Sequence, residues 1–510
     1  MLTDSMRSFQ QNSFIYLFGI CFLILCLVGY VYYPVLDFEF LSLDDGQYIL
    51  NNPHLREGIS LSGIFWAFKA DLLIASDYSD YWQPVTLISH MLDIQLFGYK
   101  AGAHHWTNVI IHTLNVLLLF FLFKSITRAY GLSLLVALIF AMHPIQVESV
   151  AWITSRKHIL ALFWGLLIMH YYVKHLDKRT FVQQGVLATL FGLALMTKAT
   201  MLILPIIMVL LDYWPLRRMP TLSIQNIFKN LFYEKWPLLV IAILYIPIPF
   251  VGNAHAMDQG LNLGLIRFPA MISRVFTDYL FYVCNAFYPM NLSLYGPVAQ
   301  IHIEPYRVIV SMIGMGTILF GVWKWRLKAS YLIIGFMWFV VALTPMLVIE
   351  RPADRFMYFP LCGLAVMLVW GMRDVLSSLP WKKSISCVLG IGLIGTLSLL
   401  STYQIEHWRN NESLYRHTIK HRPNVFVAYL NLGNALKRRG QSAEAEKFYL
   451  QALQVYPNYP EALINLSLLY LQTDRRQKAH HFYDQAIRLG QLRPALKKHM
   501  DFLRSALAHE

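Results

Sequence analysis

The sequence predicts an all-α protein, with a polytopic membrane domain followed by a helical repeat domain. Of its 510 residues, 56% are hydrophobic, 15% aromatic and only 14% charged, which is too apolar for a soluble protein of this length. Near residue 403 the composition becomes polar and a 34-residue period begins. We therefore expect a membrane domain over 1–402 and a tetratricopeptide-type α-solenoid over 403–510.

Composition also excludes several classes of protein. The five cysteines all lie in apolar runs without a CxxC pair, so neither a disulfide framework nor a thiolate metal site is expected. The net charge of +14 is divided between short loops and the C-terminal region, so it reports membrane topology and not nucleic-acid binding.

The first apolar segment, 14–33, is long enough to cross a bilayer and no small-residue cleavage site follows it, so we interpret it as a retained membrane helix. A polar outer loop over 37–106 comes next and contains Asp44 and Asp45. Two adjacent carboxylates beside a bilayer are costly, which favours a catalytic role. A solvated Asp-Asp-Gly turn is the alternative.

Ten further apolar segments follow, and basic residues recur at every second junction between them. By the positive-inside rule those junctions are cytoplasmic, which gives about eleven spans with the N-terminus inside and the repeats outside. Segment 274–288 is also apolar, but counting it as a crossing would invert every later loop, so we expect it at the outer interface. The ten segments are 108–123, 132–150, 159–173, 182–196, 201–213, 236–251, 308–323, 331–349, 356–370 and 385–400.

In the repeat domain, equivalent positions recur 34 residues apart, and Gly433 and Pro457 complete the tetratricopeptide pattern. Such repeats usually bind polypeptide. The surplus of Lys and Arg here is either a solvated helical surface or a contact with an acidic partner or lipid headgroups. The recurring pairs are Leu432 with Leu466, Ala445 with Ala479, Tyr449 with Tyr483 and Ala452 with Ala486.

Polar residues inside the membrane domain form two kinds of feature. His105, Asn108, His112 and Asn115 make one stripe on a helix, either a hydrogen-bonded seam or a binding site, and because the stripe lacks a carboxylate we predict no metal site there. Charged residues gather at outer helix ends, where they suit an anionic headgroup, although snorkelling or local pairing is an equal alternative. These residues are Glu148, Arg156, Lys157, Lys198 and Arg355.

Several motifs, taken together and in order, carry a resemblance. They are Leu43-Asp44-Asp45, Tyr81-Trp82-Gln83-Pro84, the His105 to Asn115 stripe, His143-Pro144 with Glu148 and Trp152, Asp212-Tyr213-Trp214-Pro215, and Ala353-Asp354-Arg355. With the terminal repeats, the chain resembles bacterial relatives of the transmembrane and tetratricopeptide-repeat O-mannosyltransferases, which are polyprenyl-phosphate-sugar-dependent glycosyltransferases of the GT-C fold. The resemblance covers nearly the whole chain.

The resemblance implies a GT-C-type membrane domain in which Asp44 or Asp45 is the catalytic base. It also implies a donor site near the lipid phosphate. We assign to that site Arg156, Lys157, Lys198, Arg274 and Arg355, together with Glu148, His143, Trp82 and His112. The chain departs from the bacterial pattern at Ser155, His158, Ala199 and Thr200, which bears on the sugar or on the phosphate contacts.

The expected reaction is inverting transfer of a hexose, with mannose as the leading candidate, to Ser or Thr of exported proteins that the repeats present. A polyprenyl phosphate is a good leaving group, so one base suffices, with cations offsetting the phosphate charge. Transfer to a lipid or cell-surface glycan, and a non-enzymatic membrane scaffold, are the alternatives. We expect no cofactor besides the lipid-linked donor, with a divalent metal left open, and a bacterial inner-membrane location because no organelle signal is visible.

Overall fold

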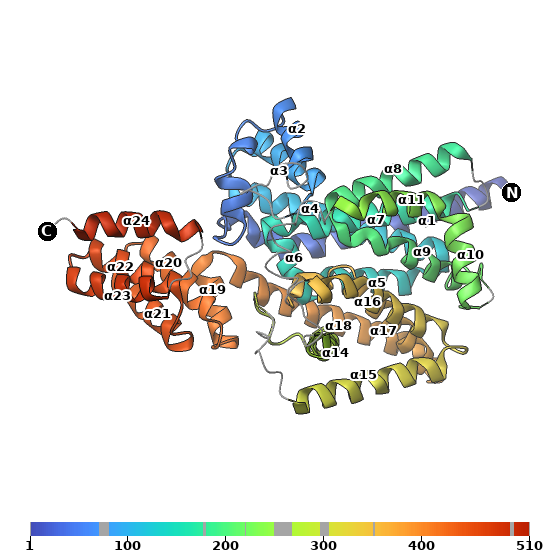
Figure 1. Cartoon of the computed structure of the whole chain (residues 1–510). Helices are drawn as coiled ribbons and strands as arrows, with labels where there is room; N and C mark the ends of the chain where they lie inside the picture. The colour runs from blue at the N-terminus through green and yellow to red at the C-terminus, as the bar shows by residue number, and fades with distance from the viewer. Residues whose placement is uncertain are drawn as a thin grey trace. The chain divides into compact units, whose positions relative to one another are not determined.

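The computed structural model describes residues 2–70, 81–176, 180–219, 221–248, 268–295, 305–349, 352–489 and 494–508. Part of the predicted outer loop, 71–80, and the end of the predicted span 236–251 lie outside these ranges. The chain divides into two compact units, Met1–Leu292 with Ala299–Glu406, and Ser293–Val298 with His407–Glu510. Every element within the described ranges is a helix, which confirms the predicted all-α class (Figure 1).

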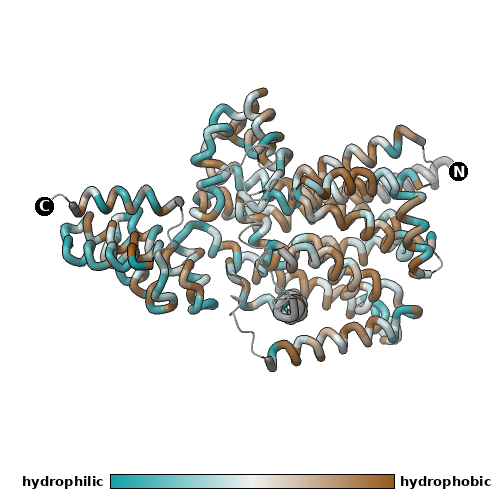
Figure 2. Tube along the Cα trace, viewed as in Figure 1, coloured by the Kyte–Doolittle hydropathy of each residue, from teal (hydrophilic) through white to brown (hydrophobic). Residues whose placement is uncertain are grey.

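Five helices of the first unit are long and apolar enough to cross a membrane. Figure 2 shows brown, hydrophobic stretches in many helices of this unit. The expectation of a multi-pass membrane protein agrees with this. Helices α8 (Phe181–Thr197), α9 (Leu204–Tyr213) and α11 (Trp236–Tyr245) are apolar but shorter, so the number of about eleven spans stays a prediction. The five are α1 (Leu2–Tyr32), α4 (Ala101–Thr127), α15 (Pro305–Trp325), α16 (Ser330–Ile349) and α18 (Lys382–Ile405).

The predicted span 132–150 is not one straight helix. Helix α5 (Tyr130–Met142) and the segment Pro144–Ala151, which contains α6 (Val147–Ala151), meet at a bend of 53°. The cause is Pro144, because a proline disfavours helical backbone at the residue before it, and His143 is extended with φ −75° and ψ 126°. A second extended residue, Trp152, precedes α7 (Arg156–Lys174).

Helix α14 (Phe268–Phe287) contains the segment that we expect at the outer interface. In Figure 1 it is seen end-on, whereas α15, α16 and α17 (Leu361–Leu376) run along the page. Tyr279 fixes this crossing by donating a hydrogen bond to the carbonyl oxygen of Val340 at 2.9 Å. Its position at the outer interface stays a prediction. The predicted span 356–370 begins later than expected, because Asp354–Met357 forms a 3₁₀ turn before α17.

The second unit consists of antiparallel helix pairs, as the 34-residue period predicts. Gly433 lets two of them approach closely: a Cβ atom at this position would lie only 2.4 Å from the Tyr449 ring. The two residues belong to consecutive helices of one repeat, so the small residue and the aromatic residue of the pattern pack against each other. The helices are α19 (Asn411–His421), α20 (Phe426–Arg438), α21 (Ser442–Val455), α22 (Pro460–Gln472), α23 (Arg476–Arg488) and α24 (Pro494–Ala508).

Candidate functional site

The Asp45 carboxylate joins the outer loop to the chain break before α7. It is fully buried, and its Oδ1 accepts hydrogen bonds from Trp152 Nε1 at 3.0 Å and from the Thr154 backbone N–H at 3.3 Å. Its Oδ2 accepts one from the Leu41 N–H at 2.9 Å. Burial raises the pKa of Asp45 to about 6, although these donors oppose the rise.

Asp44 differs from its neighbour. It is half-buried, and among the described residues no hydrogen bond engages its carboxylate. The backbone explains the difference: a π-helical turn, Gly46–Leu50, begins just after the pair, and adjacent residues of a helical turn point in different directions. Of the two predicted bases, only Asp44 therefore presents an oxygen that an acceptor hydroxyl can reach without first breaking a hydrogen bond.

Arg355 and Glu148 form an ion pair close to this loop. Arg355 Nη1 donates to Glu148 Oε1 at 2.6 Å, and the Arg355 backbone N–H donates to Oε2 at 3.3 Å. The Arg355 guanidinium also lies 5.2 Å from the centre of the Trp152 ring. Trp152 thus contacts both Asp45 and Arg355, so one indole separates the acidic loop from the ion pair.

Three basic side chains surround the ring of Phe356. Arg355 Cζ lies 4.9 Å and Lys198 Nζ 5.7 Å from its centre, and the His158 ring stacks on it at 5.9 Å. Lys198 Nζ is 2.9 Å from His158 Nε2. These four residues, with Thr200, line a cavity of about 30 Å³, which has room for two or three water molecules. A phosphate therefore fits only if side chains move.

Lys157 lies on the outer-loop side of this region. Its Nζ is 5.4 Å from the centre of the Tyr48 ring and 5.9 Å from that of Tyr81. Both aromatic residues come from the outer loop and follow the acidic pair in sequence. Cation–π contacts of this kind hold an ammonium group near the loop.

Arg156 points elsewhere, into a closed set of contacts. It is fully buried and donates to Asn108 Oδ1 at 2.8 Å, to Asp93 Oδ2 at 2.5 Å, and to the backbone oxygens of Ser89 at 3.1 Å and His104 at 3.0 Å. Its predicted contact with the donor phosphate stays a prediction, and a phosphate would have to displace one of these acceptors.

The remaining predicted donor-site residues do not line the Phe356 cavity, and each contacts a different part of the first unit. Three of their contacts are to backbone carbonyl oxygens, which is typical of structural polar groups. Their hydrogen-bond partners are the Ala286 oxygen for His143 at 2.9 Å, the Tyr358 hydroxyl for His112 at 2.8 Å, the Phe68 oxygen for Trp82 at 2.9 Å and the Leu347 oxygen for Arg274 at 2.7 Å.

The polar stripe of α4 meets the broken segment after α5. Asn108 Nδ2 lies within hydrogen-bonding distance of the carbonyl oxygens of Val150, Trp152 and Ile153, at 3.0 to 3.3 Å. A chain break leaves backbone carbonyls without helical partners, and these side chains supply the missing donors. The contacts favour the structural seam over the binding site.

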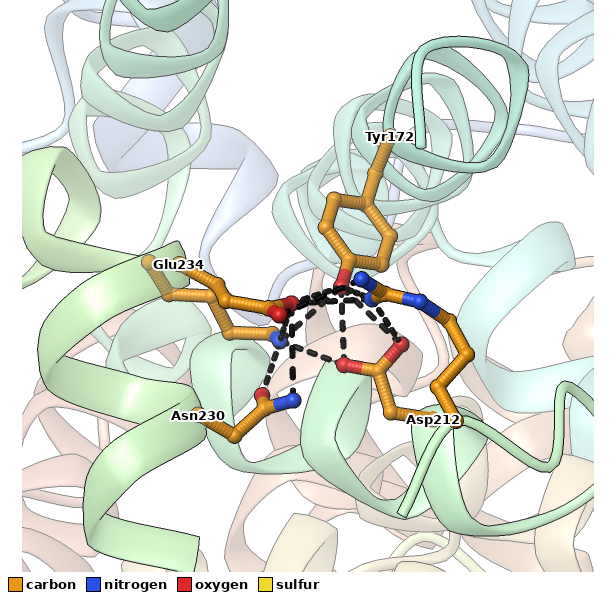
Figure 3. Close-up of polar contacts among 6 residues, drawn as sticks. Tyr172, Asp212, Asn230 and Glu234 are labelled. Atoms are coloured by element: carbon orange, nitrogen blue, oxygen red, sulfur yellow. Dashed lines mark hydrogen bonds and ion pairs between the residues drawn. The ribbon is translucent and has the colours of Figure 1, made fainter. Parts of the chain in front are cut away.

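One polar network was not anticipated from the sequence. At the ends of α7 and α9, Tyr172 and Asp212 meet residues at and just after the end of α10 (Ile224–Glu234), as Figure 3 shows. Lys235 Nζ lies 2.5 Å from Asp212 Oδ2, and both residues are fully buried. Arg218 bridges Asp212 and Glu234 at 2.8 Å each. Asp212 belongs to one of the recognised motifs, but nothing in the sequence indicated its partners.

Comparisons with known proteins agree with the two-part architecture. A family model described as tetratricopeptide repeat matches residues 424–491. A membrane unit followed by tetratricopeptide repeats is thus the class of protein that the fold defines.

Curated proteins that resemble the chain over most of its length have more specific names. Protein O-mannosyl-transferase TMTC1 of Homo sapiens is 25% identical over 486 residues, covering 84% of this chain and 54% of that protein. Protein O-mannosyl-transferase F38B6.6 of Caenorhabditis elegans is 24% identical, covering 83% of this chain and 61% of the relative. The chain is therefore similar to protein O-mannosyl-transferases over most of its length, and it spans little more than half the length of these relatives.

Among solved structures, the Archaeoglobus fulgidus oligosaccharyltransferase tethered with an acceptor peptide is similar to 76% of this chain and 55% of its own, with 10% sequence identity and a TM-score of 0.39.

Proposed function

We propose that this protein is a membrane glycosyltransferase that moves a hexose, mannose being the leading candidate, from a polyprenyl phosphate to Ser or Thr hydroxyls of exported proteins. The observation that carries the proposal is the similarity to protein O-mannosyl-transferases over 84% of the chain. The membrane unit also contains an acidic loop that one indole, that of Trp152, separates from a group of cations.

In the proposed reaction Asp44 is the base and Asp45 positions it. The Asp44 carboxylate takes the proton of the acceptor hydroxyl, and the hydroxyl oxygen attacks the anomeric carbon from the face opposite the phosphate. The bond from that carbon to the phosphate oxygen breaks, the phosphate leaves with the electron pair, and the sugar configuration inverts. Asp45 is less suited to this role, because its oxygens already accept three hydrogen bonds.

Lys198 and Arg355 would offset the charge of the departing phosphate, since both lie within 6 Å of the same Phe356 ring. The repeats would present the acceptor protein. We place the protein in a bacterial inner membrane with its N-terminus in the cytoplasm and its repeat unit in the periplasm, following the distribution of basic residues.

The test is transfer by purified protein from radiolabelled polyprenyl phosphate mannose to a periplasmic protein extract. Label should appear on protein and should fall by about 10² to 10⁴ in Asp44→Asn, the usual contribution of a general base. Asp37→Asn, which alters an exposed carboxylate at the start of the same loop, is the matched control and should retain transfer.

The outcomes separate the alternatives. Label on extracted glycolipid in place of protein would support the lipid or glycan acceptor. If no member of a panel of polyprenyl phosphate hexoses yields labelled product with folded protein, the glycosyltransferase proposal is wrong and a scaffold role gains support.

A further inference from the structure

Helices α3 (Pro84–Phe97) and α4 bring together two histidines and an aspartate that no part of the proposed reaction uses. His90 and Asp93 are three residues apart on α3, so they share a face, and His104 lies in the first turn of α4. One ring nitrogen from each histidine and one Asp93 oxygen all lie within 4.8 Å of one another. Both histidines are fully buried and Asp93 is 1% exposed.

The nitrogens of this cluster are unusually short of partners. Among the described residues, neither ring nitrogen of His90 has a hydrogen bond, and neither does Nδ1 of His104. Buried polar atoms without partners are rare in folded proteins, and an absent ion is one explanation for several that lie together. His104 Nε2 lies 2.7 Å from the Gly98 carbonyl oxygen, so this nitrogen carries the proton and Nδ1 keeps its lone pair.

We propose that His90, Asp93 and His104 bind one divalent transition-metal ion, with zinc as the best match. Two imidazoles and a carboxylate are typical zinc ligands, and a backbone carbonyl that fixes the other nitrogen of a ligating histidine is their usual support. Tetrahedral zinc with bonds of about 2.05 Å places its ligand atoms ~3.4 Å apart. His104 Nδ1 and Asp93 Oδ2 are already separated by 3.4 Å.

Arg156 is the neighbouring group that the ion must accommodate. Its Nη2 lies 2.5 Å from the same Asp93 oxygen, and its other donors bond Asn108 and backbone oxygens. The metal ion and the guanidinium therefore share one carboxylate. Their mutual repulsion lowers the affinity for the metal ion below that of an isolated site with the same ligands. The remaining contacts keep Arg156 in place when the ion binds.

The place of the ion in the fold indicates a structural role. It would cross-link α3 and α4, and through Arg156 and Asn108 this corner is connected to the carbonyl oxygen of Trp152. The Trp152 indole bonds Asp45, so the ion would help to hold the outer loop. Because all three ligand residues are buried, the ion would stabilise this corner of the fold.

The experiment measures metal content, independently of sugar transfer. Full-length protein in detergent, freed of its affinity tag and of metal, is incubated with Zn²⁺, dialysed and analysed by mass spectrometry of the metal. We expect about one zinc per chain in the wild type and at least a tenfold loss in His90→Gln and His104→Gln. Zinc should also raise the unfolding midpoint of the wild type but not that of His90→Gln or His104→Gln.

His105→Gln is the matched control, because His105 is an equally buried histidine on the next position of α4 whose Nε2 faces the Glu39 oxygen at 3.2 Å. This variant should keep the zinc even if it is less stable. If His90→Gln does not fold, Asp93→Glu, which keeps the charge for Arg156 but misplaces the ligand oxygen, replaces it. Wild-type protein that retains no zinc, or equal zinc in the ligand variants and the control, would overturn the proposal.

Discussion

Replacing Asp45 by asparagine removes a buried charge while keeping the size of the side chain. Burial raises the pKa of Asp45 from an ordinary 3.8 to about 6. An acid whose pKa is raised by folding stabilises the protein through its neutral form below pH 3.8, and this contribution is lost as the pH rises through 6. One pKa unit corresponds to about 1.4 kcal/mol, so the total loss is about 3 kcal/mol, of which about 2 kcal/mol falls between pH 4.5 and 7.5.

The variant escapes this loss because asparagine does not ionise. The asparagine amide nitrogen would take the place of the oxygen that accepts from the Leu41 N–H, so two donors would face each other. At pH 4.5 we therefore expect the variant to be less stable than the wild type by about 1–3 kcal/mol. By pH 7.5 the stability difference should have shifted in favour of the variant by about 2 kcal/mol.

Thermal unfolding of detergent-purified protein at both pH values measures the shift. Asp37→Asn is the control, because this carboxylate is exposed and its loss should change stability by no more than about 0.5 kcal/mol at either pH. A stability difference between wild type and Asp45→Asn that does not change with pH would refute the reasoning, since it would mean that Asp45 ionises as if it were in water.

Three further predictions concern other parts of the chain. Asp212→Asn should destabilise the membrane unit by about 3–5 kcal/mol in thermal unfolding, because it removes the carboxylate 2.5 Å from the buried Lys235 ammonium. Adding Lys235→Met should recover most of this loss, and no recovery would contradict the ion-pair explanation. In the transfer assay, Arg355→Gln should lower kcat/KM by about 10² to 10³ and Arg355→Lys by less, because lysine keeps the charge; equal losses would exclude charge stabilisation. Gly433→Ala should lower the free energy of unfolding of the repeat unit by about 1–3 kcal/mol in thermal unfolding, because its Cβ meets the Tyr449 ring. In a protein that already carries Tyr449→Leu, the same glycine substitution should cost less.

The fold class followed from local sequence signals. The 34-residue period predicted the repeats because each repeat places the same small and aromatic residues against its neighbours, as Gly433 and Tyr449 do. Apolar length predicted about eleven spans, and five of them are single helices long and apolar enough to cross a membrane. The predicted span 132–150 meets the same test only as two helices joined by a bend of 53° at Pro144, which hydropathy does not register.

The site was less accessible to sequence reasoning because it depends on distant contacts. The sequence paired Asp44 with Asp45 but could not distinguish them, since the burial of Asp45 rests on Trp152, 107 positions along the chain. The stripe on α4 lacks a carboxylate, and the residues of the proposed zinc site lie outside it. Asp93 comes from α3 and His104 precedes the first residue of the stripe, so the sequence did not indicate that they meet.

Two of the four departures from the bacterial pattern, His158 and Thr200, line the cavity where the donor phosphate is proposed to bind. His158, one of these positions, contacts Lys198 and stacks on Phe356, and Thr200 lines the same cavity. An acidic residue at position 158 would pair with Lys198 and reduce the positive charge available to a phosphate. His158 supplies no such negative charge, so we expect the cavity to attract an anion more strongly than it would with an acidic residue at this position. Substituting His158→Asp should therefore weaken binding of polyprenyl phosphate, measured by displacement of labelled donor, whereas His158→Asn, which is neutral and similar in size to Asp, should not. Equal weakening by both would show that the shape of the histidine matters and not its charge.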